Sequence, residues 1–351
     1  MSVKRHVMPF MAGAVAVTGF APFGLYPVPV LTLAWLFARW RDATTTRDAM
    51  IDGYAYGAGF FLSGVSWVYV SLHDFGAMPA PVAAGVTVLF CAILSCYPAA
   101  AGGIAHRYYR HSRWFLLAAP AAWVITEWIR SWLFTGFPWL SAGYSQIPVS
   151  PLAGWAAIAG VHGVGFLVAT AAALLMALRR PAWSATSMPR SVSAVTLVVI
   201  IVSGGFLKQV EWTRPAGEPV TIALVQGNIP QDMKWQPGRL QQTLDTYLSL
   251  VRSTSARLTI LPETALPLFL DEVPGRYLDA LGTHVLKAQG DLLIGVPERS
   301  GPDSYFNSVV TVGAAPTQYY RKVHLVPFGE FIPLRPVLAG IVGAMSIPLQ
   351  D

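Results

Sequence analysis

Two charged residues in the C-terminal third of the sequence stand where enzymes often place side chains that do chemistry. Glu263 follows the apolar segment 258–261, in Leu-Pro-Glu-Thr, and Lys322 lies near the end of the segment 317–323. A carboxylate among apolar neighbours can have a raised pKa and act as a general base, and a fixed ammonium can stabilise an oxyanion. Taken singly, each could also be an ordinary charged residue at the end of a strand. The pair becomes informative if the fold brings the two side chains together.

The segments around these residues alternate between the patterns of strands and helices. Residues 237–252 carry apolar side chains on one helix face, and 220–226 has the continuous apolar character of a buried strand. Strand–helix alternation that ends in two consecutive strands predicts a layered α/β or α+β domain. No GxGxxG, P-loop or GxSxG motif occurs, so nucleotide binding and the common serine-hydrolase elbow have no support. We expect strands at 220–226, 258–261, 291–297, 307–312 and 317–323, and helices at 237–252 and 275–289.

The first 210 residues differ in composition from the rest of the chain. Of the 351 residues, 54% are hydrophobic and 12% are charged, whereas soluble proteins are about 25% charged. Residues 1–210 contain 13 Lys or Arg and 5 Asp or Glu, and residues 211–351 contain 11 and 13. We therefore expect a transmembrane domain of about seven helices at 1–210 and a water-soluble domain at 219–351. The basic residues form short clusters between apolar runs, which argues against a nucleic-acid partner.

The number of spans follows from where the basic residues lie. Basic clusters precede the first apolar run and follow the second, fourth and sixth runs. Seven spans place all of these clusters on one side of the membrane, as the positive-inside rule requires, whereas six would separate Lys4 and Arg5 from the others. The N-terminus is then cytoplasmic, the residues after about 210 lie outside the cytoplasm, and the first run is not expected to be a cleaved signal peptide. The expected spans are 7–23, 24–38, 52–72, 79–104, 114–134, 151–178 and 191–209.

The connection between the fifth and sixth expected spans, residues 135–150, is too apolar for a simple solvated loop. Trp139 and Tyr144 in this connection suit the membrane–water interface, where an aromatic ring buries its body and leaves a polar atom in water. The connection is either a plain aromatic belt or a loop that shapes a lipid-facing site. In the preceding span, Glu127 and Arg130 lie three residues apart on one helix face, which predicts a structural ion pair rather than a proton path.

The cysteines indicate neither a disulfide nor a metal site. Cys91 and Cys96 lie five residues apart in one apolar run, on different faces of the expected helix, and are expected to be small buried residues. The chain has no CxxC motif and no histidine-rich spacing typical of metal ligands. We therefore expect no metal ion and no cofactor.

Three motifs taken together are more specific than any single residue. Val-Gln-Gly-Asn-Ile-Pro, Leu-Pro-Glu-Thr and Tyr-Arg-Lys-Val-His-Leu-Val-Pro-Phe-Gly-Glu-Phe resemble the nitrilase, or carbon–nitrogen hydrolase, superfamily. Joined to an N-terminal bundle of spans, they resemble the apolipoprotein N-acyltransferases of Gram-negative inner membranes. The resemblance covers nearly the whole chain, including Thr-Gly-Phe-Pro-Trp-Leu and the segment 226–235. It implies a multi-pass α-helical membrane bundle followed by an α/β nitrilase-like αββα sandwich domain, incomplete at its C-terminus.

The resemblance also implies roles for particular residues. The family uses a Glu-Lys-Cys triad, so Glu263 corresponds to the base and Lys322 to the oxyanion-stabilising lysine. Glu330 corresponds to a second functional acid, and Trp235 matches a tryptophan that matters in the family. The expected substrate-binding residues are Trp235, Trp139 and Tyr144.

The implied reaction takes an acyl chain from a phospholipid, typically phosphatidylethanolamine, and adds it to the amine of the diacylglyceryl-cysteine at an apolipoprotein N-terminus. It is the last step of lipoprotein maturation and proceeds by a ping-pong thioester mechanism, on the periplasmic face of the bacterial inner membrane. Two rival functions stay open at this point. A membrane-tethered nitrilase-type amidase would act on a small substrate and need no lipid entrance. A transporter with an extracytoplasmic sensor domain would need polar groups lining the bundle, and the spans supply few.

One departure from the family's pattern concerns the nucleophile. The family's catalytic cysteine follows the Phe-Gly-Glu-Phe segment by some tens of residues, but the sequence has no Cys after Cys96 and lacks the family's closing transmembrane helix. We expect the sequence to be a C-terminally incomplete piece of a longer protein rather than a degenerate homologue. Because an acyl-enzyme needs a nucleophile beside the base, residues 1–351 alone are expected to be catalytically inert.

Overall fold

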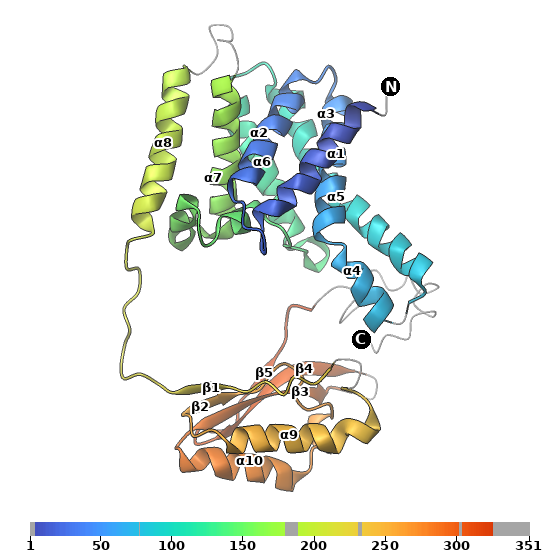
Figure 1. Ribbon diagram of the computed structural model, residues 1–351, viewed down its shortest axis with the longest axis vertical. Helices are drawn as coiled ribbons and strands as arrows, with labels where there is room; N and C mark the ends of the chain where they lie inside the picture. The colour runs from blue at the N-terminus through green and yellow to red at the C-terminus, as the bar shows by residue number, and fades with distance from the viewer. Residues whose placement is uncertain (1–3, 77, 180–188, 231–233, 302–303, 326–351) are drawn as a thin grey trace. The chain divides into compact units, whose positions relative to one another are not determined.

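The computed structural model describes residues 4–76, 78–179, 189–230, 234–301 and 304–325 (Figure 1). The chain divides into two compact units, and the division along the chain comes between Arg214 and Pro215. The first unit is helical, and the second contains the sheet.

Each of the apolar runs predicted as a span overlaps a helix of the first unit. Neighbouring helices lie side by side, with α3 against α1 and α5, and α7 against α2, α6 and α8 (Figure 1). The largest fully buried side chains of this unit are aromatic and include Trp40, Tyr56 and Phe115. The helices are α1 Lys4–Ala16, α2 Pro27–Asp42, α3 Thr46–Gly64, α4 Trp67–Val70, α5 Ala80–Tyr109, α6 Phe115–Arg130, α7 Ala156–Arg179 and α8 Arg190–Leu207.

Three of the described helical segments are long and apolar enough to cross a membrane, namely Ala80–Tyr109, Pro151–Arg179 and Arg190–Leu207. A fourth crossing results if Thr46–Gly64 and Trp67–Phe75, which are bent by 49° relative to each other, form one span. The remaining predicted spans correspond to shorter helices, and α2 and α6 have 16 residues each. The count of seven spans therefore stays a prediction.

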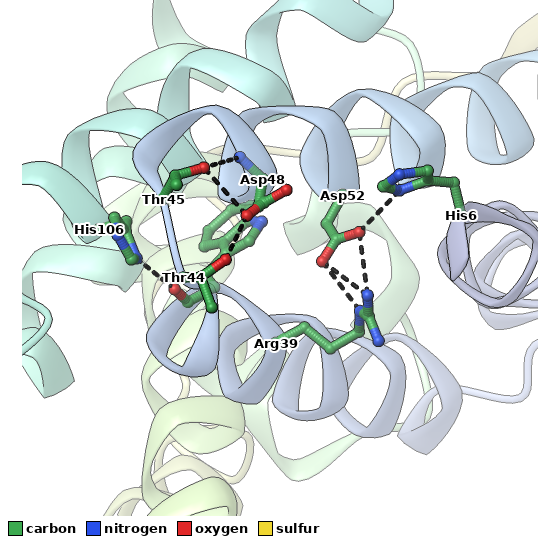
Figure 2. Close-up of polar contacts among 8 residues, drawn as sticks. His6, Arg39, Thr44, Thr45, Asp48, Asp52 and His106 are labelled. Carbon is green, nitrogen blue, oxygen red and sulfur yellow. Dashed lines mark hydrogen bonds and ion pairs between the residues drawn. The ribbon is translucent and has the colours of Figure 1, made fainter. Parts of the chain in front are cut away.

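A partly buried polar network joins three of these helices (Figure 2). Asp52 of α3 is 1% exposed and accepts hydrogen bonds from Arg39 of α2, at 3.0 Å from Nε and 3.1 Å from Nη2. His6 of α1 contacts the same carboxylate, with Nδ1 at 3.1 Å from Oδ1. Next to this network, Thr45 caps α3 by accepting a hydrogen bond from the backbone N–H of Asp48 at 3.1 Å. The buried charge of Asp52 is thus paired, and its partners tie α1 and α2 to α3.

The second unit contains one mixed five-stranded sheet in the order β1-β2-β3-β4-β5. The first three strands are parallel, and β4 and β5 each pair antiparallel to the strand before them. Helices α9 and α10 cover one face of the sheet (Figure 1). All of the predicted strands and helices are confirmed. Their bounds are β1 Ile222–Leu224, α9 Leu240–Arg252, β2 Leu258–Ile260, α10 Gly275–Lys287, β3 Asp291–Arg299, β4 Tyr305–Gly313 and β5 Tyr319–Arg321.

The core of this unit lies between the sheet and its helices. The alternating residues Leu292, Ile294 and Val296 of β3 are at most 1% exposed and belong to the same apolar cluster as the inner faces of α9 and α10. Such alternation is expected for a strand with one face against a helical layer. Within the residues that the structure describes, the unit has one helical layer on one sheet. The full αββα sandwich therefore stays a prediction.

Candidate active site

The structure brings Glu263 and Lys322 together in the second unit. The Lys322 Nζ atom donates a hydrogen bond to Glu263 Oε1 at 3.2 Å. The Glu263 side chain is 62% exposed and that of Lys322 is 28% exposed. A carboxylate and an ammonium are thus paired at a surface that a substrate can reach.

The topology explains why the two residues face the same edge of the sheet. Glu263 follows β2 and Lys322 follows β5. These strands run in the same direction, because β3 is parallel to β2 and two antiparallel pairings then reverse the chain twice. Two intervening strands nevertheless separate β2 from β5 by about 14 Å. The loop after β2 must therefore cross the sheet edge to reach Lys322.

Gly295 of β3 is the residue that permits this crossing. A Cβ atom at position 295 would lie 2.3 Å from the Pro262 carbonyl oxygen and 2.9 Å from the Glu263 Cα atom. The loop is also fixed to β3, because the Leu266 N–H donates to the Gly295 carbonyl at 3.3 Å. Sequence reasoning missed Gly295, although a glycine inside a strand pattern is a known signal of close backbone approach.

Asn307 of β4 completes the contact and was also missed from the sequence. Its side-chain Nδ2 donates a hydrogen bond to Glu263 Oε1, and its backbone carbonyl accepts a hydrogen bond from the Lys322 N–H at 2.8 Å. Asn307 therefore touches both charged residues. Nothing in its sequence neighbourhood singles it out, because a polar residue at the start of a strand is common.

A second ammonium lies close to Glu263. Lys234 Nζ donates a hydrogen bond to the Glu263 backbone carbonyl at 3.3 Å. Burial lowers the pKa of Lys234 from its ordinary value, and the Glu263 carboxylate opposes that shift. Lys234 precedes the predicted substrate residue Trp235, whose side chain is 54% exposed. Sequence reasoning named Trp235 and overlooked its neighbour.

The predicted second acid, Glu330, lies outside the described residues, so its role stays a prediction. Among the described residues, no group of three or more His, Cys, Asp or Glu side chains could hold a metal ion. The free cysteines, Cys91 and Cys96, both belong to α5 of the first unit; Cys91 is buried, as expected, but Cys96 is exposed.

The first unit contains the other predicted substrate residues, Trp139 and Tyr144. Both lie in the connection after α6, and their side chains are 50% and 51% exposed. The Trp139 ring packs on Trp67 with the centroids 5.2 Å apart, and Phe137 makes an edge-on contact with Phe90 at 5.0 Å. The connection therefore presents a cluster of partly exposed aromatic rings.

Glu127 and Arg130 interact electrostatically, as the predicted ion pair requires, but the described contacts include no direct hydrogen bond between them. Both side chains are buried, at 5% and 2% exposure. The direct hydrogen bonds of each side chain go to backbone groups of the following connection. Three-residue spacing placed them on one helix face, and the irregular backbone beside that face supplies their hydrogen-bond partners.

Comparison with known proteins agrees with this architecture. Residues 12–174 match the model of the apolipoprotein N-acyltransferase N-terminal domain, and residues 221–346 match that of carbon-nitrogen hydrolase. The apolipoprotein N-acyltransferase of Nitrosomonas europaea is 46% identical over 352 residues, which are 99% of this chain and 69% of that protein. Those of Methylococcus capsulatus and Chromobacterium violaceum are 42% and 44% identical, over 99% and 97% of this chain and 69% and 65% of theirs. The motif resemblance is thereby confirmed, and the chain belongs to the apolipoprotein N-acyltransferase family of acyltransferases.

Proposed function

We propose that this chain carries the base and the oxyanion-stabilising lysine of an enzyme that N-acylates apolipoproteins. The acyl donor in the proposal is a phospholipid, phosphatidylethanolamine, and the acceptor is the N-terminal amine of a diacylglyceryl-cysteine. The contact between Glu263 and Lys322 at 3.2 Å, inside a carbon–nitrogen hydrolase domain, is the observation that carries the proposal. The names of the relatives support the acceptor and the type of transfer.

The arrangement around Glu263 suits a general base that takes the proton from the thiol of the family's catalytic cysteine. Asn307 and Lys322 both donate to Oε1, and we assign Oε2 to proton transfer. In the proposed first step, Oε2 takes the thiol proton and the sulfur attacks the ester carbonyl of the phospholipid. Lys322 stabilises the resulting oxyanion. The tetrahedral intermediate expels the lysophospholipid alkoxide, which takes the proton from Glu263, and a thioester remains.

The second half of the proposed reaction uses the same residues in the same roles. The lipoprotein amine attacks the thioester carbonyl and gives its proton to Glu263, while Lys322 again faces the oxyanion. Collapse of the intermediate forms the amide, and the departing thiolate recovers the proton from Glu263. The base is therefore returned to its starting state after each transfer.

In the proposal, the first unit crosses the bacterial inner membrane with seven spans and the second unit lies in the periplasm as an αββα sandwich. This orientation rests on the shared side of the basic clusters. The exposed rings of Trp139 and Tyr144 face lipid, Trp235 contacts substrate, and Glu330 acts as a second acid. Each of the three aromatic side chains is at least half exposed, which leaves it free to meet a ligand.

Conservative substitutions in the full-length enzyme test the proposal. Glu263→Gln keeps the shape and removes the base, and Lys322→Met removes the ammonium and keeps the stem. Each should lower the rate of N-acylation of a lipoprotein by on the order of 10²-fold or more, measured from the intact mass of the acceptor with phosphatidylethanolamine as donor. Glu272→Gln, which removes a surface carboxylate paired with Arg299 in the same unit, is the matched control. Near-normal transfer by either site variant would show that its assignment is wrong.

A further inference from the structure

The connection after α6 has a backbone that its own residues do not favour. Phe134 and Leu140 have φ angles of +54° and +59°, and Gly136 has +83°. Non-glycine residues rarely adopt such left-handed conformations, which cost free energy and persist only where the surroundings impose them. Trp139 lies within this strained stretch, next to Leu140. Contacts from outside the stretch must therefore hold it in place.

Arg130 at the end of α6 supplies the first of these contacts. Its Nη1 atom donates hydrogen bonds to the carbonyl oxygens of Phe137 at 2.5 Å and Trp139 at 2.7 Å. The Phe137 N–H donates in return to the Arg130 carbonyl at 2.8 Å. The guanidinium lies over the Phe61 ring at 5.3 Å and is almost fully buried. The Arg130 side chain therefore binds the backbone of both Phe137 and Trp139.

Glu127, one turn earlier on α6, fixes the other side of Trp139. Its Oε1 atom accepts a hydrogen bond from the Ala142 N–H at 3.0 Å. Irregular backbone at membrane depth is tolerated only where protein groups satisfy its N–H and C=O groups. Arg130 satisfies the carbonyl oxygens of Phe137 and Trp139, and Glu127 satisfies the N–H of Ala142. The bound backbone groups therefore lie at Trp139 and on both sides of it in the chain.

The buried polar groups around Glu127 are only partly hydrogen-bonded. The carboxylate lies near the indole of Trp123, but among the described residues neither its Oε2 atom nor the Trp123 Nε1 atom makes a well-formed hydrogen bond. Both residues line a cavity of about 10 Å³, which has room for about one water molecule. Buried charged groups often contribute no more stability than well-packed apolar residues of the same volume. Local choices that reduce stability are expected at functional positions.

We infer that Glu127 and Arg130 are positioning residues that hold Trp139 and its aromatic neighbours as a platform for the acyl chains of the donor. The platform consists of Trp67, Phe90, Phe137 and Trp139, and the Trp139 ring is half exposed at its surface. The inference rests on the proposed function, because it takes the connection to be the lipid-facing part of the enzyme. Neither residue touches the reacting atoms in this scheme. Each acts through the loop that it holds.

The full-length enzyme is tested as Arg130→Gln, Arg130→Lys and the control Arg113→Gln, which removes an exposed arginine near the other end of α6. Arg130→Gln should raise the KM for phospholipid by about tenfold, the effect of losing one aromatic contact, and change kcat by less than about threefold. Arg130→Lys should recover part of the loss, because an ammonium can still reach one carbonyl. The control should behave as the unmodified enzyme. An unchanged KM in Arg130→Gln, or a fall in kcat alone, would overturn the inference.

A second measurement follows the contact of Trp139 with lipid and does not depend on enzyme activity. Fluorescence quenching by vesicles of brominated phosphatidylcholine, taken as the difference from the same enzyme carrying Trp139→Phe, reports how Trp139 meets acyl chains. Arg130→Gln should reduce this difference, and Arg130→Lys, which keeps the buried charge if the glutamine variant does not fold, should reduce it less. Equal quenching in all three forms would contradict the inference even if acyl transfer were normal. Absence of phospholipid acyl transfer in the unmodified enzyme would instead contradict the proposed function.

Discussion

Replacing Gly295 with alanine should separate Glu263 from Lys322 without touching either residue. The new Cβ atom would lie 2.3 Å from the Pro262 carbonyl oxygen and 2.7 Å from the Thr264 nitrogen. Carbon and oxygen atoms in proteins approach to about 3.3 Å, so the loop must rise from β3 by about 1 Å. Both close atoms belong to backbone, which leaves no flexible side chain to absorb the clash.

The consequence for activity follows from the short contact at the site. Glu263 Oε1 and Lys322 Nζ are 3.2 Å apart, and a further 1 Å takes them beyond hydrogen-bond distance. A misplacement of this size typically costs on the order of 10²-fold in rate. Forcing an extra methyl group into the packed crossing should also destabilise the second unit by about 1–3 kcal/mol.

The measurements are the rate of lipoprotein N-acylation and the midpoint of thermal unfolding of the full-length enzyme. Gly275→Ala is the matched control, because a Cβ atom at the first residue of α10 meets nothing within 4 Å. That control should leave the rate unchanged and could raise the stability by up to about 1 kcal/mol. Full activity in Gly295→Ala would refute the reasoning that the loop crosses at this glycine to position Glu263.

Further predictions concern topology, pH and the helical unit. A reporter enzyme that works only in the periplasm should be active when fused after Lys208, and one that works only in the cytoplasm should be inactive there. Activity of the cytoplasmic reporter would exclude seven spans. Hydrogen bonds from Arg321 hold the pKa of Glu298 below its ordinary value. The pair therefore stabilises the sheet above about pH 4.3, and this contribution is lost as the pH falls through the lower folded-state pKa. Denaturant unfolding between about pH 5 and 3 should lose less stability in Arg321→Gln than in the unmodified enzyme, and equal slopes would contradict the assignment. Asp52→Ala should lower the free energy of unfolding of the first unit by about 2 kcal/mol, because Arg39 loses its buried partner. An unchanged unfolding temperature in detergent would show that the network does not stabilise the unit.

Regular elements could be predicted from the sequence because their periodicity is a local property. The apolar spacing in 237–252 predicted α9, and the apolar segment 291–297 predicted β3. Element ends were less well predicted. The first strand was expected over 220–226 but pairs only over Ile222–Leu224, because strand length depends on the partner strand and not on apolar character alone.

The contacts that complete each site could not be read from the sequence. Asn307 matters because β4 lies between β3 and β5, and only the sheet order places its amide beside Glu263. The backbone partners of Glu127 and Arg130 could not be predicted for a related reason. Helix geometry predicts which side chains share a face, but it does not report that a later loop will return to that face with unsatisfied backbone groups.

Both units place their candidate functional residues on irregular backbone that other residues hold. The strands β2 and β5 are about 14 Å apart, so the crossing over Gly295 is a requirement of the proposed chemistry of Glu263 and Lys322. After α6, the loop bound by Arg130 holds the Trp139 ring half exposed against Trp67. In each case the informative residue breaks a local rule, as a glycine inside a strand or as a buried charge near a helix end. Such violations identify the residues that position a site, which motifs alone do not.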